Sequence, residues 1–499
     1  MQTGHKRWTT FASATAAVVA IGCGDLTTDT APGGASDPSV ETKAAAVETK
    51  AAAVATPSGG LEPHTRFFIP PPNPGAVQQI VDLAKGGKLI DAARVTAMEA
   101  TPHAVWFTDG SPSDVKAAVR KTVKAAALLR TVPALVAYNI PFRDCAQYSA
   151  GGAIDAAAYK RWIEGFAAGI GNEQVVVILE PDGLGIIPFN GEWCQPMVTD
   201  ERGNRVPAPG ADPATRYELM NFAIDKLAKS APHALVYLDG THSAWLGVGD
   251  IASRLANGGV ARAAGFFLNS ANYQFAPNLV QYGTWLSSCL TYATSVAPGD
   301  FGSCPNQYWN GGPLPSKIAV INGPWNGVAL DANGQWSDAS DTVSLNTSGI
   351  NLRYANMLGA TPAAVHFVID TSRNGLGPLN VTPFGAAPYN QPAGVLSALA
   401  GGNWCNPPGA GLGLRPTANT GAALLDAYLW IKVPGESDGS CDIAGGARAW
   451  DFTAYNPWNV PAATQNNFDP LWGMPDPAAG AWFTQQALEL AQNATPPLF

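Results

Sequence analysis

The sequence predicts an α/β fold in which about seven parallel strands form a barrel with long loops at one end. Seven short apolar runs recur along the chain, and each one ends in a polar turn. Helical stretches separate many of these runs. Because alternating strands and helices favour a parallel sheet, seven or eight such units favour a barrel.

The predicted strands share β-branched and aromatic residues that stop at Asp, Asn, Gly or Pro. They are residues 105–107, 134–138, 175–180, 234–238, 265–268, 365–369 and 427–431. The third run is the clearest, since four β-branched residues precede Leu179, which indicates a strand buried on both faces. Pro181 cannot continue a central strand, so the chain turns there and Asp182 lies at the C-terminal end of the strand.

Helical patterns fill several of the gaps between the runs. They cover residues 113–129, 155–169, 215–229 and 347–358. The segment from about 280 to 345 is longer than an ordinary connection and contains a further apolar run at 317–322. We interpret this segment as an insertion closed by Cys289 and Cys304.

The N-terminal segment has the features of an export signal. Lys6 and Arg7 precede an apolar run at 11–21, which is too short to span a bilayer, and small residues then lead to Cys23. This pattern predicts a lipoprotein-type signal peptide at 1–23 with Cys23 as the lipidated residue. A secretory signal cut nearby is the alternative, and either one predicts an extracellular or cell-surface protein.

The next segment, residues 24–60, is rich in Ala, Thr, Gly, Pro and Ser and contains VETKAAA twice in succession. Such a composition has little apolar surface to bury, so we predict a flexible linker. Residues 61–499 contain no second linker and are predicted to form one domain, which is within the range of barrels with insertions.

Composition excludes several classes of function. Charged residues make up 13% of the chain, the formal net charge is −9, and no basic patch is visible, so nucleic acid is not an expected partner. The sequence has no Cys-x-x-Cys or His-x-x-x-His pair, so we expect no metal site of the zinc type. The 15 Trp and 13 Tyr suit a core, and also a groove that stacks flat faces such as sugar rings.

Six cysteines follow Cys23, an even number that indicates disulfides in an exported protein. Fifteen pairings are possible in principle. Pairing sequence neighbours gives the simplest set: Cys145 with Cys194, Cys289 with Cys304, and Cys405 with Cys441.

Polar residues gather at or just after the predicted strand ends, which converge in a barrel. The aspartates are Asp144, Asp182, Asp239, Asp370 and Asp438. Other polar residues beside them are Tyr138, Arg143, His242, Asn272, Arg373, Lys432 and Glu436. One such aspartate often only caps a helix or fixes a turn. Five together predict a functional cluster.

Clustered carboxyl groups without a nucleophile motif fit the cleavage of a glycosidic bond. That reaction needs one protonated carboxyl group and one ionised carboxylate, and neighbouring carboxylates hold one of their number protonated. Trp245 and Trp404 lie in polar loops and are predicted to stack on sugar rings, whereas Trp430 lies in an apolar strand and is predicted to pack in the core.

Five motifs extend this hypothesis, because together and in order they resemble family 6 glycoside hydrolases, which are cellulases that cleave β-1,4-glucan. The motifs are YNIPFRDC at 138–145, LEPD at 179–182, LDGTHSAW at 238–245, DTSRNG at 370–375 and WIKVPGESDG at 430–439. The resemblance implies a distorted TIM-like barrel of about seven parallel strands with long active-site loops, an inverting mechanism and no cofactor. It also supports the 145–194 and 405–441 disulfides.

The resemblance further implies a role for each matching residue. Asp182 matches the general acid, Asp144 the group that keeps it protonated, and Tyr138 the group that crowds the reacting ring. Asp438 matches the proposed base, and water relayed through Ser149 and the Asp144 region is the competing account. The remaining matches are sugar-binding Asp239, His242, Trp245, Asn272, Trp404, Lys432 and Glu436, and carboxylate-orienting Arg143 and Arg373.

The short connection after Asp144 favours an open groove and endo action. The long segments 186–214, 280–345 and 442–478 leave exo action by a cellobiohydrolase as the alternative. A non-catalytic glucan-binding protein at the cell surface is the alternative from another class. We expect a monomer that binds β-1,4-glucan or cello-oligosaccharides and meets a membrane only through its N-terminal lipid.

Overall fold

The computed structural model describes residues 60–191, 194–308 and 328–499. The predicted signal peptide with Cys23, nearly all of the predicted linker and the apolar run at 317–322 lie outside the described residues. Residues Val54–Phe499 form one unit, and the fold described here is that of its described part.

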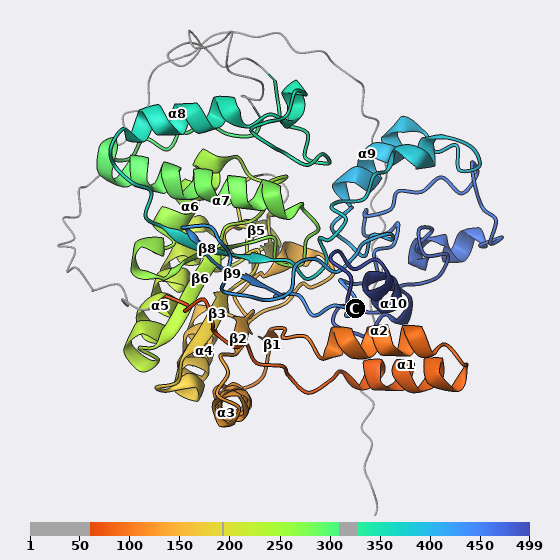
Figure 1. Cartoon of the computed structure of the whole chain (residues 1–499), viewed down its shortest axis with the longest axis horizontal. Coiled ribbons are helices and arrows are strands. Elements are labelled where there is room, and N and C mark those ends of the chain that lie inside the picture. The colour runs from red at the N-terminus through yellow and green to blue at the C-terminus, as the bar shows by residue number, and fades with distance from the viewer. Residues whose placement is uncertain (1–59, 192–193, 309–327) are drawn as a thin grey trace, which may run out of the picture. The chain divides into compact units, whose positions relative to one another are not determined.

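Seven parallel strands form one curled sheet, which confirms the predicted fold class (Figure 1). The strands are β1 (Val105–Phe107), β2 (Ala134–Ala137), β3 (Val175–Leu179), β6 (Ala234–Asp239), β7 (Gly265–Leu268), β8 (His366–Asp370) and β9 (Leu425–Leu429), paired in that order. The last strand ends two residues earlier than predicted. The Ile431 N–H donates to the Asp370 carboxylate at 3.1 Å instead of a strand carbonyl, so the ladder stops before it.

The two edge strands, β1 and β9, approach each other without forming a ladder among the described residues. The Ala104 N–H donates to the Trp430 carbonyl at 2.8 Å, and Trp106 Nε1 donates to the Ile431 carbonyl at 2.8 Å. These contacts define a seam between β1 and β9, and the sheet is therefore a distorted barrel rather than a fully paired one.

Helices surround this sheet, and Figure 1 shows α3 to α7 along its outer face. The helices are α1 (Pro74–Lys85), α2 (Leu89–Glu99), α3 (Pro112–Leu128), α4 (Ala156–Ile170), α5 (Pro213–Ser230), α6 (Val248–Asn257), α7 (Ala276–Thr291), α8 (Ser348–Leu358), α9 (Ala393–Gly401) and α10 (Thr484–Gln492). The four predicted helices correspond to α3, α4, α5 and α8. Aspartate or serine side chains cap three of these four, with Ser111, Asp155 and Asp212 accepting N–H groups of the first turn.

The predicted insertion from about 280 begins too early. Residues 280–291 belong to α7, which buries Leu279, Trp285 and Leu286 in the layer between the sheet and the helices. Many Ser, Thr and Gln residues interrupt the apolar pattern of this helix, and they obscured it in the sequence. The segment that departs from strand–helix alternation therefore starts after Thr291.

Each central strand is buried on both faces, as the β-branched pattern predicted. Val175, Val177 and Leu179 pack outward against the helices, whereas Val176 and Ile178 pack inside the barrel. This alternation follows from the two-residue period of a strand. A barrel filled with side chains leaves the strand ends, rather than the interior, as the place for a site.

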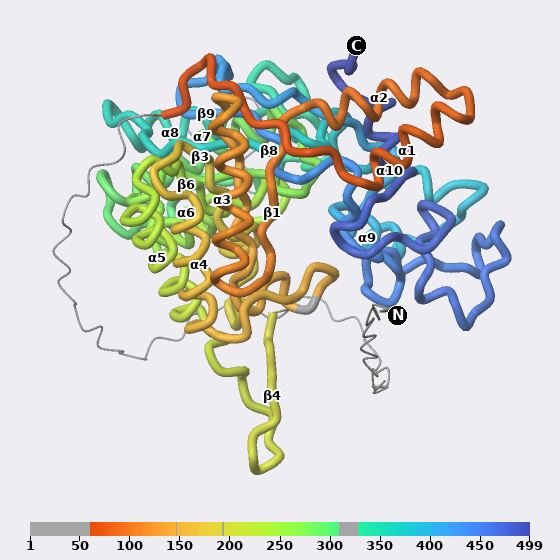
Figure 2. Tube along the Cα trace, turned by 90° about the horizontal axis from the view of Figure 1, so that it is seen from below, coloured from red at the N-terminus to blue at the C-terminus, as the bar shows by residue number. Residues whose placement is uncertain are grey.

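A short antiparallel hairpin, β4 (Met197–Thr199) and β5 (Arg205–Pro207), extends away from the sheet (Figure 2). Disulfides join Cys145 to Cys194, Cys289 to Cys304 and Cys405 to Cys441, with Cα–Cα distances of 5.6, 5.7 and 5.8 Å. Three disulfides fit an extracellular protein. Within the described part of the chain, no helix has the length and apolar character needed to cross a membrane.

Candidate functional site

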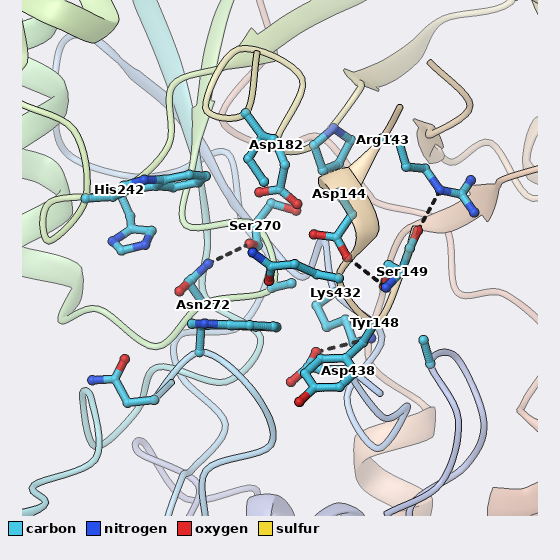
Figure 3. A pocket seen from close by; sticks show the side chains of 18 of the residues that line it. Arg143, Asp144, Tyr148, Ser149, Asp182, His242, Ser270, Asn272, Lys432 and Asp438 are labelled. Carbon is cyan, nitrogen blue, oxygen red and sulfur yellow. Dashed lines mark hydrogen bonds and ion pairs between the residues drawn. The ribbon is translucent and has the colours of Figure 1, made fainter. Parts of the chain in front are cut away.

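The C-terminal ends of the strands open into a cleft of about 780 Å³ (Figure 3). Twelve of the predicted site residues line it: Tyr138, Arg143, Asp144, Ser149, Asp182, His242, Trp245, Asn272, Trp404, Lys432, Glu436 and Asp438. Residues from six separate parts of the sequence thus meet in one place, as convergent strand ends require.

Asp182 lies on the turn that follows β3, and its carboxyl group points into the cleft beside that of Asp144 (Figure 3). The turn is tight, with a φ of +63° at Asp182 and +51° at Glu180. Burial raises the pKa of Asp182 well above its ordinary value, and the nearby Asp239 and Asp144 raise it further. Both effects favour the protonated form of this carboxyl group.

Asp144 follows β2, and its Oδ2 accepts the Ser149 N–H at 2.7 Å. Burial raises its pKa to about 6, against the lowering effects of the Ser149 hydrogen bond and the Arg143 charge. The Asp438 charge adds to the rise. Asp144 therefore changes its charge near pH 6.

The carboxyl group of Asp438, in contrast, is surrounded by basic and N–H groups. Its Oδ2 accepts hydrogen bonds from Arg373 Nη1 at 2.8 Å and from the Asn406 N–H at 3.0 Å, and Lys432 Nζ lies 3.5 Å from its Oδ1. Burial alone would raise its pKa, but the charges of Arg373 and Lys432 lower it below its ordinary value. Asp438 is an ionised carboxylate at neutral pH.

Three residues of the predicted cluster lie behind the cleft rather than on its surface. One is Asp370, which is fully buried and whose carboxylate accepts backbone N–H groups, including those of Ile431 and Lys432. Asp239 accepts the N–H groups of Leu184, Gly185 and Thr241 at 2.9 to 3.2 Å, which fixes the turn after Asp182. Arg373 is fully buried against Asp438. Asp239 therefore faces the protein backbone in this structure, although it was predicted to hold a sugar.

The Arg143 guanidinium also differs from its predicted geometry. It donates to the carbonyl groups of Tyr138, Thr108 and Ser149 at 2.5 to 2.9 Å, and it lies 4.6 Å from the centre of the Tyr138 ring. Among the described residues, no carboxylate accepts a hydrogen bond from it. Arg143 acts on Asp144 through its charge, and it fixes the ring of Tyr138.

Aromatic and neutral polar groups form the walls of the cleft on both sides of the carboxyl groups. The Trp245 ring packs against Gly185, where a Cβ atom would lie 2.6 Å from the ring. The His242 ring lies 5.7 Å from that of Trp245, and burial lowers the pKa of His242 to about 3, so it is neutral. Trp404 lies 5.9 Å from Tyr148.

Several cleft residues were not predicted as site residues. Trp106 on β1, Tyr148, Ser270, Gln274 and Asn403 also line the cavity. The N-terminal helices also reach this region, because Asn73 Nδ2 donates to Glu436 Oε1 at 3.0 Å. This contact joins residues 363 positions apart, and a sequence pattern cannot reveal it.

The sequence model described as glycosyl hydrolases family 6 matches residues 63–494, which include the whole site. The chain belongs to this family. Within the described residues, no group of three or more His, Cys, Asp or Glu side chains is arranged to hold a metal ion.

Relatives within the family carry two kinds of name. "Endoglucanase A" of Thermobispora bispora is 31% identical over 350 residues, covering 69% of this chain and 52% of the relative. "Endoglucanase 1" of Streptomyces sp. (strain KSM-9) is 32% identical over 343 residues, covering 68% and 65%. A "1,4-beta-D-glucan cellobiohydrolase C" of Emericella nidulans is 28% identical and covers 86% and 77%. The matched region is about half the length of the first of these proteins.

The fold is also similar to a solved structure of the endoglucanase Cel6 from Mycobacterium tuberculosis, in complex with a thio-linked cellobioside. The two chains are 26% identical, the TM-score is 0.52, and the match covers 86% of this chain and 97% of the other. The predicted family resemblance is thereby confirmed in sequence and in fold.

Proposed function

We propose that this protein hydrolyses β-1,4-glucosidic bonds in cellulose or a related β-glucan by an inverting mechanism, cutting within chains. One observation carries the proposal: a single cleft holds Asp182, whose pKa is raised well above its ordinary value, together with two carboxyl groups that are ionised at neutral pH. These are Asp144, with a pKa of about 6, and Asp438, with a lowered pKa. This is the protonation pattern that acid-assisted cleavage of a glycosidic bond needs. The names of the family relatives support the choice of glucan.

Asp182 is the proposed general acid, which donates its proton to the oxygen of the leaving sugar. Asp144 beside it keeps that proton in place while ionised, and it stabilises the positive charge that develops on the reacting ring. Tyr138, held by Arg143, crowds that ring and favours its distortion. Glucosyl units would stack on Trp245 and Trp404 and bind His242, Asn272, Lys432 and Glu436.

The base has two candidates. Asp438 is ionised, but hydrogen bonds from Arg373 and Asn406 occupy one of its oxygens and make it a weak base. Asp144, with a pKa of about 6, is better matched to accept a proton through a water chain near Ser149. The geometry therefore favours the relay, with Asp438 holding Arg373 and Lys432 in place.

Endo action is favoured by the short connection after Asp144. A single 3₁₀ turn at Asp144–Ala146 is followed by α4, which begins at Ala156, so little chain is available there to roof the cleft. Exo action remains the alternative, because residues 332–333 and 479–480 also line the cleft from other long segments.

Two measurements on fresh product test these proposals. Inversion of a β-linkage must release the α anomer first, which NMR detects before mutarotation, and release of the β anomer would contradict the mechanism. If the enzyme cuts within chains, the viscosity of a soluble cellulose derivative should fall rapidly while only a few new reducing ends have formed. Nearly pure cellobiose with little viscosity loss would instead assign exo action. If the protein binds β-glucan but hydrolyses none, the result would instead support the alternative of a non-catalytic glucan-binding protein.

Export and anchoring complete the proposal. We propose a lipoprotein signal at residues 1–23, a lipid on Cys23 and a tether at 24–60 that carries a monomeric domain at the cell surface. Cys23→Ser should release the protein from the membrane fraction while cleft chemistry is unchanged. Recovery of the variant in the membrane would contradict the anchor, and light scattering tests the monomer.

A further inference from the structure

Two turns carry the paired carboxyl groups, and buried charges from outside the cleft hold both turns. The Asp144 turn comprises residues 138–144 after β2, and the Asp182 turn comprises residues 180–186 after β3. Glu180, the first residue of the Asp182 turn, is fully buried. Its Oε2 accepts the N–H groups of Asn139 at 2.8 Å and Ile140 at 2.9 Å, so a side chain of one turn binds the backbone of the other.

Arg216 on α5 makes the complementary connection. Its Nη2 donates to the Pro141 carbonyl of the Asp144 turn at 2.8 Å. Its Nη1 donates to the Gly183 and Ile186 carbonyls of the Asp182 turn at 2.8 and 2.9 Å. One buried guanidinium group thus spans both turns.

Arg254 on α6 completes the support of the Asp182 turn. Its Nη1 donates to the Leu184 and Gly185 carbonyls at 3.0 and 2.9 Å. With the contacts of Arg216, four successive carbonyl groups, from residue 183 to residue 186, bind arginine side chains. The carboxylate of Asp239 accepts two N–H groups of the same turn.

Burial disfavours the charged forms of both Glu180 and Arg216. Burial raises the pKa of Glu180 to about 7, despite its backbone hydrogen bonds and the nearby Tyr159 and Arg216. Burial lowers the pKa of Arg216 to about 10. Buried charged groups contribute less to stability than apolar groups of the same volume would, so their contacts must be explained by what they position.

We propose that Glu180 and Arg216 are positioning residues that set the separation between the Asp144 and Asp182 carboxyl groups. This inference rests on the proposed function. Asp182 faces Asp239 from β6, Asp144 and Tyr138; Glu180 faces Tyr159 from α4, Arg216 from α5 and Tyr138. The charge of Asp144 keeps Asp182 protonated only while the two stay close, so loosening either turn weakens the proton donor.

Charge-conserving variants separate position from charge. Glu180→Asp keeps the carboxyl group but shortens the side chain. Arg216→Lys keeps the positive charge but loses the forked guanidinium group that reaches both turns. Each should lower kcat on cellohexaose by about 10-fold to 100-fold. The alkaline limb of the kcat profile should move to lower pH, because Asp182 then loses its proton more easily. KM should change little, since neither residue lines the cleft.

Glu180→Gln keeps the length and an oxygen acceptor, and it should retain more of kcat than Glu180→Asp. Asp426→Asn is the matched control. Asp426 binds Tyr237 and His366 at 2.6 and 2.7 Å at the opposite ends of the strands, so its loss should leave the alkaline limb in place. Near-UV circular dichroism and thermal melting establish that each variant is folded.

A substrate with a 2,4-dinitrophenolate leaving group provides the decisive comparison, because it departs without a proton. Glu180→Asp should be impaired far less on this substrate than on cellohexaose. Equal losses on both substrates, with an unmoved alkaline limb, would overturn the positioning role. Failure of the proposed function is distinct, because wild-type protein would then release no sugar from cellohexaose.

Discussion

The Asp182 turn and the segment after β9 that carries Asp438, residues 432–438, line the same cleft, yet they place basic side chains differently around an aspartate. Around Asp182, arginine side chains bind backbone carbonyls, and among the described residues no ion pair involves its carboxyl group. Around Asp438, Arg373 and Lys432 face the carboxylate itself. The placement of basic side chains, on backbone or on carboxylate, therefore decides which aspartate stays protonated.

The largest expected effect is on the proton donor. Asp182→Ala should lower kcat on unactivated glucan by about 100-fold to 10,000-fold, because general acid catalysis of the leaving group is lost. Binding of cello-oligosaccharide should persist, since Trp245, Trp404 and the polar walls are unchanged. Titration calorimetry and sugar-release assays test both halves. Near-normal turnover of Asp182→Ala would contradict the role of Asp182 as proton donor, and with it the proposed functional difference between Asp182 and Asp438.

Removing the carboxylate of Asp438 should mainly affect the stability of the fold. Asp438→Asn leaves Arg373 buried without its ion-pair partner, and we expect a loss of about 3 to 5 kcal/mol in the free energy of unfolding at pH 7. The folded-state pKa of Asp438 is lowered, so its contribution is present above the unfolded value near 3.8 and is lost as pH falls through the folded value. Urea unfolding should show the deficit shrinking below pH 4, and a deficit independent of pH would contradict the ion-pair account.

Asp144→Asn should give a smaller effect of the opposite sign. The folded-state pKa of Asp144 is raised from 3.8 to about 6, so the wild-type carboxylate costs stability above pH 6. The variant should be more stable than wild type by about 1 to 3 kcal/mol at pH 7, with the gain disappearing below pH 4. The kcat of Asp144→Asn on glucan should also fall, because the water relay loses its proton acceptor. The alkaline limb of the remaining activity should move to lower pH, because Asp182 loses a negative neighbour. If Asp144→Asn were less stable than wild type at pH 7, the ionised Asp144 side chain would instead stabilise the folded protein.

The sequence predicted the strands and the cleft residues for a clear physical reason. Apolar runs such as 175–179 must be buried, and the polar residues that end them must meet at one edge. The supporting residues carry no such signal. Arg216 and Arg254 lie on amphipathic helices where arginine usually faces solvent, and only the packing of α5 and α6 turns them toward the Asp182 turn.

The same lack of a sequence signal explains why the position of Asp239 and the extent of α7 were not predicted. Both an exposed and a buried aspartate can follow a strand, so the sequence could not tell a sugar ligand from a backbone acceptor. The polar residues of α7 satisfy partners from distant segments, such as Asn278, which binds Gly334 and Trp336. Those partners are invisible until the chain has folded.

The seam between β1 and β9 also bears on self-association. A sheet edge with free N–H and C=O groups can recruit strands from other molecules and begin aggregation. Here the two edges of one sheet face each other, and Ala104 and Trp106 use donors at the seam to bind the opposite side. Together with the bridge between Thr417 and Tyr428 of β9, these contacts leave fewer edge groups open to pairing with another molecule.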